Sequence, residues 1–152
     1  MLDMNNPTDQ VAVSELPLYI RENRVAINAV SGVGNVGVTD LTVAAGSVSL
    51  TIGSELGSYG YEIVVIDADA VVALAKILGG TQGQVKVLVF QDNNISITDG
   101  VASGGNFYLN HLPALSDFSA LTNDVLALVN IGGDGASVYG YWKELYRQVA
   151  VK

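Results

Sequence analysis

The chain has 152 residues, a net charge of −8 at neutral pH, seven Lys and Arg residues in all, and no Cys. This length suits one domain, the scarcity of cations argues against a nucleic-acid groove, and the absence of Cys excludes disulfides and thiolate metal sites. Hydrophobic residues make up 49% of the chain and supply a substantial core, whereas charged residues make up only 14%, against about a quarter in typical domains.

The segment 1–24 differs in composition from the rest, because it contains two of the three Pro and two of the three Arg residues. We predict that residues 1–24 form an extended N-terminal arm that anchors the protein to a partner, and that residues 25–152 form a single β-sandwich domain. The N-terminus has no basic region followed by an apolar core, so it is unlike a signal peptide. No apolar stretch is long enough to predict a transmembrane helix.

A glycine-rich motif at residues 32–37 follows an alternating stretch at residues 25–30 and has the spacing G-x-G-x-x-G. In a dinucleotide-binding fold, such glycines bring backbone N–H groups to a pyrophosphate at the start of a helix. Residues 38–43 are instead rich in β-branched residues. We therefore predict a glycine-rich loop or bulged hairpin at this motif, and no bound cofactor.

A strictly alternating strand is predicted at residues 46–52, with Val48, Leu50 and Ile52 on one face. A loop follows at residues 53–60.

The stretch at residues 61–66 shows little alternation, so we expect this strand to be buried on both faces. Residues 70–78 fit two structures: a short helix capped by Asp67 and Asp69, or an extended segment. The composition of the stretch does not decide between them.

The second half of the chain predicts more short strands, separated by turn residues. They are expected at residues 84–90, 95–97 and 107–109, and a loop is expected at residues 111–123. A buried strand at 124–131 and a closing strand that begins at Ser137 complete the set. Short strands with turns about every ten residues predict an all-β fold, a jelly-roll-like β-sandwich with at most one short helix.

No pattern of catalytic or metal-binding residues stands out, so we predict that the protein is not an enzyme and holds no metal ion. His111 is the sole histidine, and it has no recognisable nucleophile or orienting carboxylate in the sequence. Seven aspartates are potential calcium ligands, but Asx side chains at turns explain most of them: Asp67, Asp69, Asp92, Asp99, Asp117, Asp124 and Asp134.

The closing strand carries the remaining candidates, four aromatic residues that are expected to contact a subunit or a ligand: Tyr139, Tyr141, Trp142 and Tyr146. In a regular strand, Tyr139 and Tyr141 share one face with Arg147, and Trp142 and Tyr146 share the other. Aromatic residues on both faces favour one face in the core and the other against a neighbouring subunit or a sugar.

Residues 41–152 resemble the small β-sandwich or jelly-roll knobs of tailed-phage virion proteins, which occur in capsid decoration (cement) proteins, head fibres and tail-fibre tips. The resemblance covers about three quarters of the chain and lies in a pattern of strands and turns. Its parts are the alternating strand at 47–52, Tyr-Glu-Ile-Val-Val-Ile at 61–66, the glycine-led strand at 83–90 with the following Asn-Ile-Ser-Ile, and residues 124–129 with the aromatic closing strand at 139–147.

This resemblance implies a homotrimer on the capsid surface of the virion, made in the host cytoplasm and bound to the major capsid protein. The anchor would lie in the N-terminal arm, with candidate contacts at Leu16, Pro17, Tyr19, Arg21 and Arg24. The chain lacks the long repetitive shaft of a fibre, which favours a decoration protein. The alternative is a receptor-binding knob of a head or tail fibre, whose partner would be a host-surface glycan. Neither nucleic acid nor membrane is an expected partner.

Overall fold

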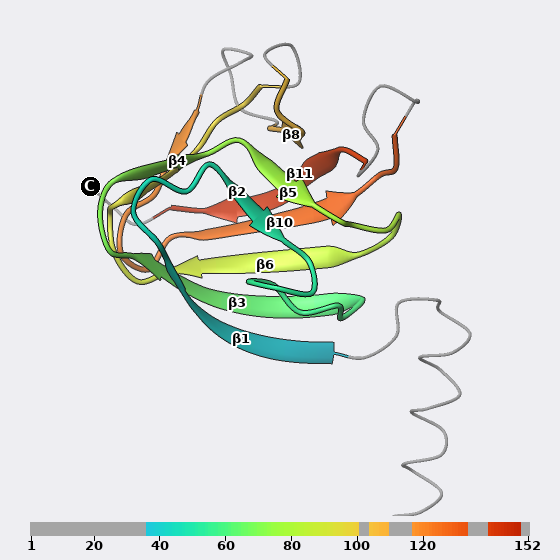
Figure 1. The fold of residues 1–152 in the computed structure, drawn as a ribbon, viewed down its shortest axis with the longest axis horizontal. Helices are drawn as coiled ribbons and strands as arrows, with labels where there is room; N and C mark the ends of the chain where they lie inside the picture. Colours follow the sequence, from blue (N-terminus) through green and yellow to red (C-terminus); the bar gives the residue numbers. More distant parts are fainter. Residues whose placement is uncertain (1–35, 101–103, 110–116, 134–139, 150–152) are drawn as a thin grey trace, which may run out of the picture. The chain divides into compact units, whose positions relative to one another are not determined.

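Eleven β-strands and no helix make up the described part of the chain, which the computed structural model gives as residues 36–100, 104–109, 117–133 and 140–149 (Figure 1). The strands are β1 (Val36–Val43), β2 (Ser49–Thr51), β3 (Tyr61–Ala68), β4 (Val72–Leu74), β5 (Lys76–Leu78), β6 (Val85–Phe90), β7 (Ile95–Ile97), β8 (Phe107–Tyr108), β9 (Phe118–Ser119), β10 (Val125–Asn130) and β11 (Trp142–Gln148). The predicted all-β fold is confirmed. No described segment is a helix with the length and hydropathy needed to cross a bilayer.

The predicted arm at residues 1–24, with all of its candidate anchor residues, lies outside the described residues. The same holds for the stretch at residues 25–30, so the predicted boundary between arm and domain stays a prediction. Residues 70–78 are extended and form β4 and β5, so the helix considered for them is wrong.

The strands form one large sheet and two small ones. The large sheet has six strands in the order β1-β3-β6-β10-β11-β8, and the small sheets have the orders β2-β5 and β4-β7-β9. Five of the strand pairs are parallel, including β1 with β3 and β3 with β6. A jelly roll is built from antiparallel strands, so the jelly-roll-like order is not confirmed.

The parallel pairs arise because the chain coils between the large sheet and the small sheets. It passes from β1 to β2, from β3 through β4 to β5, and from β6 to β7, and each pass adds one strand to the large sheet. Val36 pairs with Tyr61, and Tyr61 pairs with Val85, so successive passes return the chain to the same level of the sheet and are nearly equal in length. β10 and β11 then extend the large sheet with antiparallel strands.

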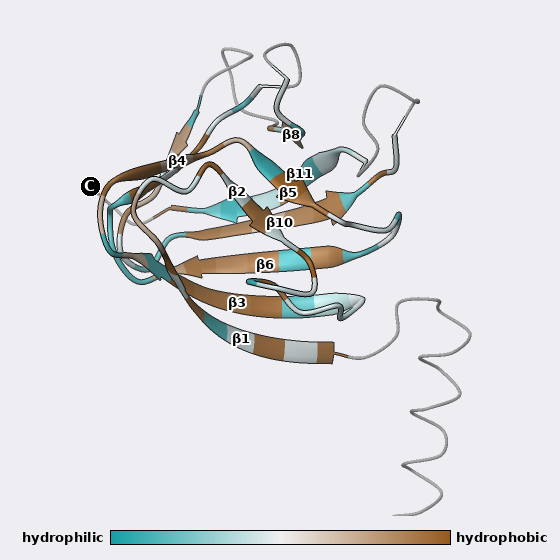
Figure 2. Cartoon of the chain, in the orientation of Figure 1, coloured by the Kyte–Doolittle hydropathy of each residue, from teal (hydrophilic) through white to brown (hydrophobic). Residues whose placement is uncertain are grey.

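The core lies between the large sheet and the small sheets. Strands β3 and β6 place Val64, Ile66, Leu88 and Phe90 in it, and the small sheets contribute fully buried side chains, among them Leu50, Leu74, Ile77 and Ile97. Burying one such side chain contributes about 1.5–3 kcal/mol. Figure 2 shows apolar colour along most of β3, β6 and β10. The half-buried residues that alternate with the core positions of β3 and β6 contribute to it.

The burial of β3 corrects the sequence-based interpretation. Its residues alternate, with Glu62, Val64 and Ile66 fully buried, whereas Ile63 and Val65 on the opposite side are half-buried. The strand is therefore not buried on both faces. Near β2, Leu50 is buried and Ile52 packs against the core, as the predicted common face requires, whereas Val48 precedes the strand and is 63% exposed.

Candidate functional site

The large sheet turns one face to the core and the other away from it. We call the second one the outer face: it consists of every second residue of four strands, counted from Val36 in β1, Tyr61 in β3, Val85 in β6 and Val125 in β10, together with Lys143, Tyr146 and Gln148 of β11. A solvated sheet face normally carries polar side chains. Here Val is the commonest residue, and Figure 2 shows the resulting apolar colour along these strands.

The middle of the outer face is a row of neighbouring residues across five strands. Backbone pairing places Val38 beside Ile63, Ile63 beside Val87, Val87 beside Ala127, and Ala127 beside Tyr146. All five side chains are apolar or aromatic. The two ends of the row are well exposed, with Val38 at 67% and Tyr146 at 53%. The row is therefore apolar along its whole length, with exposed side chains at its two ends and the buried Ala127, 8% exposed, within it. An apolar row with exposed ends is the chemistry of a protein contact surface.

Charged residues lie at opposite corners of the outer face. Asp40 and Asp67 lie toward the C-terminal ends of β1 and β3. Lys143 of β11 pairs with Val129, which lies at the level where β6 begins. The Nζ atom of Lys143 lies 4.8 Å from the centroid of the Tyr108 ring on the neighbouring strand β8, a cation–π contact. The space between the two corners is occupied by uncharged side chains.

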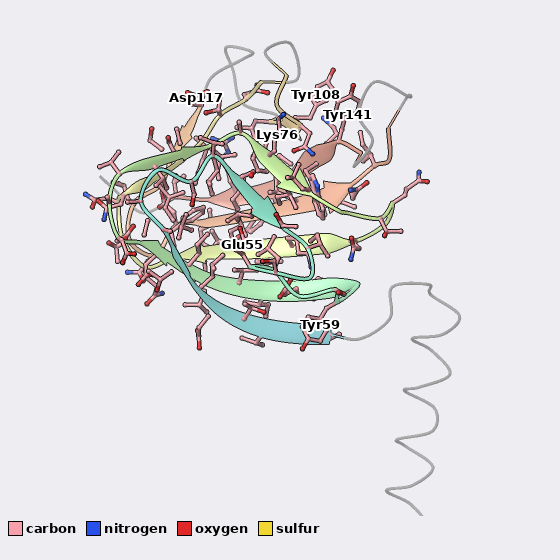
Figure 3. The ribbon with its side chains drawn as sticks, in the orientation of Figure 1. Glu55, Tyr59, Lys76, Tyr108, Asp117 and Tyr141 are labelled. Carbon is pink, nitrogen blue, oxygen red and sulfur yellow. The ribbon has the colours of Figure 1, made fainter. Side chains whose placement is uncertain are left out.

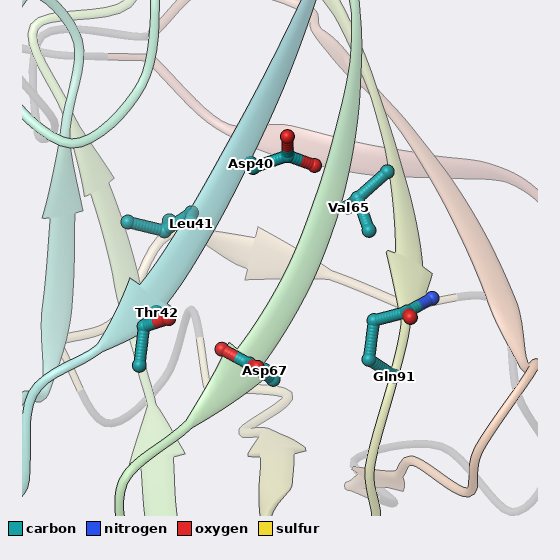
Figure 4. Close-up of a pocket in the computed structure, with 6 residues that line it drawn as sticks. All are labelled: Asp40, Leu41, Thr42, Val65, Asp67 and Gln91. Atoms are coloured by element: carbon teal, nitrogen blue, oxygen red, sulfur yellow. The ribbon is translucent and has the colours of Figure 1, made fainter.

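A shallow pocket of about 260 Å³ opens beside the acidic corner, between the ends of β1 and β3 and the residue after β6 (Figure 4). Its walls are Asp40, Leu41, Thr42, Val65, Asp67 and Gln91. The Oδ1 atom of Asp67 is buried and accepts no hydrogen bond. Two carboxylates and an amide suit a polar or cationic group, but no cluster of three potential metal ligands occurs in the described ranges.

A buried ion pair lies on the opposite, inner side of the same sheet. Lys86 Nζ is 2.5 Å from Glu62 Oε2, and both side chains are 0% exposed. The ammonium group also donates hydrogen bonds to the carbonyl oxygens of Gly57 (2.8 Å) and Tyr59 (3.2 Å). Glu62 Oε1 accepts hydrogen bonds from the Gly57 N–H and from the Thr39 hydroxyl. Each charge is thus paired and hydrogen-bonded, as burial requires, and the pair fixes the 53–60 loop to the sheet.

The glycine motif has a packing role at the one glycine that the structure describes. Gly37 lies inside β1, and a Cβ atom added there would collide with the ring of Tyr59, whose side chain lies at the start of β1 (Figure 3). The residues after Gly37 continue as a strand, so the helix required by a dinucleotide site is missing at this position, as the sequence indicated. Gly32 and Gly34 lie outside the described residues.

The aromatic candidates of the closing strand separate into different environments. Trp142 is 0% exposed and belongs to the core, so its ring is not available to a ligand or a subunit. Tyr146 is 53% exposed on the outer face, and Tyr141 is half-buried. Tyr139 lies outside the described residues. The structure therefore keeps Tyr146 as a contact candidate, and it adds Tyr108, which is 48% exposed and which the sequence pattern did not single out.

A β-bulge explains why the predicted faces of β11 are wrong. Ala127 pairs with Tyr146 but Leu128 pairs with Glu144, so Leu145 is an extra residue in β11. The bulge moves Tyr146 to the outer face and turns Arg147 to the inner one. Arg147 then reaches Glu144 with two hydrogen bonds of 2.6 Å.

Other polar candidates have structural partners or lie outside the described ranges. Asp92 accepts hydrogen bonds from the backbone N–H groups of Ala68 and Asn94, and Asp124 accepts one from the N–H of Leu121. These contacts confirm the interpretation of both as turn residues. His111 and Asp134 are outside the described residues.

Comparison with known proteins returns no relative: no family model matches the chain, and neither curated proteins nor solved structures show significant similarity to it. The function proposed below therefore starts from the chemistry of the described surfaces.

Proposed function

We propose that this protein is a structural virion protein of a tailed phage, a decoration protein that binds the major capsid protein as a homotrimer and stabilises the capsid shell. The observation that carries the proposal is the outer face, whose apolar strip crosses five strands. A surface of this kind suits permanent contact with protein. The low charged fraction of the chain, 14%, agrees with a subunit that is covered by partners.

The test is co-sedimentation of the purified full-length protein with cognate capsids that lack it. We expect saturable binding to these capsids, no binding to capsids of an unrelated phage, and a higher temperature of capsid disruption when the protein is bound. Absence of binding to the cognate capsid at micromolar concentrations would contradict the proposal.

Two variants examine the predicted anchor in the same assay. The double substitution Arg21→Ala with Arg24→Ala should weaken capsid binding at least tenfold, because a carboxylate-rich capsid surface would lose two cationic partners. Lys76→Ala is the matched control, since it removes an exposed cation from the described domain. Equal binding of both variants and of the wild type would remove the arm from the proposal.

A second candidate function is a receptor-binding knob that recognises a host-surface glycan. It is favoured by Tyr108 and Lys143, an exposed aromatic ring with a cation above it, because aromatic rings stack on sugars. Binding of the fluorescently labelled protein to host cells, lost in Tyr108→Ala and retained in Lys76→Ala, would favour this function. Binding to capsids without any binding to cells would favour decoration.

A further inference from the structure

We propose that the outer face of the large sheet is the surface through which copies of this chain associate with one another. The inference depends on the proposed function only for the number of copies, three, which would place three outer faces around a common axis. The self-association itself follows from the composition, size and charge of the face.

The composition of the outer face is that of a covered surface. Exposed positions in a solvated sheet alternate with buried ones and are polar, but Val38 and Tyr146 end an apolar row with more than half of each side chain in contact with solvent. Val36 in the next row is 63% exposed and lies beside Tyr61, which is 39% exposed. Monomeric proteins rarely leave such residues contiguous, because contact with water at each of them is unfavourable.

The size of the outer face is close to what a specific interface needs. Five strands at about 4.8 Å spacing and about six residues along each strand give a face of about 24 by 20 Å, or about 480 Å². Two facing copies would bury about 960 Å² before the relief of the side chains is counted, and specific interfaces begin at about 1,000 Å². A single small ligand would cover only part of this area.

The charge distribution of the outer face disfavours a polyanionic partner and leaves its centre open to a second copy. The chain has a net charge of −8, so two copies repel each other over most of their surfaces. The centre of the outer face adds no charge to this repulsion, because its row from Val38 to Tyr146 carries none. Nucleic acid or an anionic lipid surface would need clustered cations, and Lys143 at one corner is the cation that the described strands contribute to this face.

The experiment measures the solution mass of the full-length chain by light scattering, for the wild type and three variants. Val38→Asp and Tyr146→Lys place charges at the two ends of the same row, on β1 and β11. Val71→Asp is the matched control, because Val71 is 82% exposed but lies between β3 and β4, away from the outer face. Thermal unfolding followed by circular dichroism shows whether each variant is folded.

The proposal expects the wild type and Val71→Asp to have about three times the chain mass of 15.9 kDa, and both row variants to be folded monomers. A dimeric wild type that the row variants dissociate would also support the face as the contact, while contradicting the trimer. A monomeric wild type would overturn the inference, and so would row variants that keep the mass of the wild type. If a row variant is unfolded, the milder Val38→Thr and Tyr146→Ser should raise the dissociation constant at least tenfold.

These outcomes are independent of the capsid assay. A trimer that the row variants dissociate, but that does not bind cognate capsids, would support the self-contact and contradict the decoration function. A monomer that binds capsids would contradict the self-contact and support the decoration function.

Discussion

The two faces of the large sheet differ in a way that reverses the usual distribution of side chains. At the start of β3 and β6, the inner face holds the charged pair Glu62 and Lys86, both 0% exposed, whereas the outer face at the same level holds Ile63 and Val87. The inner charges are tolerated because each has a charged partner and further hydrogen bonds. Nothing in the described sheet compensates in a comparable way for the exposure of the apolar residues on the outer face. We therefore infer a protein partner that covers them.

The two faces also differ in what they contribute to the stability and to the assembly of the protein. A buried ion pair adds little net stability relative to apolar residues of the same size, but it is costly to break. The Glu62–Lys86 pair holds the 53–60 loop against the sheet through hydrogen bonds to Gly57 and Tyr59, and we expect it to act mainly on the specificity of the fold. The effect of the outer face is expected in assembly.

The largest effect is expected from breaking the inner pair. Lys86→Ala leaves the Glu62 carboxylate buried without its cation and should lower the free energy of unfolding by about 3–5 kcal/mol. Denaturant unfolding of the full-length protein at fixed concentration measures this change. Lys76→Ala, which removes an exposed ammonium group, should change stability by less than about 0.5 kcal/mol.

A double variant sharpens the same comparison. Glu62→Met with Lys86→Met replaces both charges with apolar groups of similar volume, so it should be more stable than Lys86→Ala and should approach the wild type. A double variant as unstable as the single one would mean that the network of hydrogen bonds to the loop, and not the paired charge, holds this region.

A smaller effect is expected where β1 meets the Tyr59 ring. Gly37→Ala forces the ring to move and should cost about 1–3 kcal/mol. If the ring is the cause, Tyr59→Ala in the same chain should recover part of that cost, so the two changes would be non-additive. Thr42→Ala, on the exposed side of the same strand, is the control. Strict additivity in denaturant unfolding would contradict the packing of Tyr59 on Gly37.

The smallest effect is expected at the bulge in β11. Arg147→Ala removes a two-point ion pair with Glu144 and a cation–π contact with Phe118, and it should cost about 1 kcal/mol because Arg147 is partly exposed. Arg147→Lys should not restore it, since an ammonium group lacks the planar fork. Lys76→Ala, which removes an exposed cation outside β11, should leave the denaturation midpoint unchanged.

Strands that are bracketed by turn residues could be predicted from the sequence. The strand expected at residues 84–90 is β6 (Val85–Phe90), and that expected at 124–131 is β10 (Val125–Asn130). The parallel coil could not be predicted in this way. Its strand partners lie far apart in the sequence, and the segments between them are short strands in place of the helices that usually signal parallel pairing.

The misinterpretation of residues 61–66 has the same physical origin as the inferred interface. Alternation in β3 is hidden because the outer positions Ile63 and Val65 are as apolar as the inner Val64, while the one polar residue within the strand's first half, Glu62, points inward. Its partner Lys86 belongs to β6, a full pass of the chain later, so local sequence does not show that the charge is paired. In the sequence, a strand whose outer face binds protein therefore shows as little alternation as a strand that is buried on both faces.

The error in the closing strand has a different cause. Alternation along a regular strand predicts the faces of Trp142, Tyr146 and Arg147, and one bulge residue, Leu145, shifts the alternation. Bulges depend on the pairing of two strands and leave no reliable local signal. Consequently the sequence located the aromatic strand, but not which of its aromatic residues is exposed.

The spacing of the coil has a consequence for how this protein can change over evolutionary time. Because Val36, Tyr61 and Val85 occupy equivalent positions in successive passes, loss or duplication of a whole pass would keep every remaining side chain on its own face. Insertion of a single residue within β3 would instead move the residues on one side of it to the opposite face, unless a bulge like that at Leu145 absorbs it. Length variants that keep both faces of the sheet are therefore expected to differ by about one full pass of the chain.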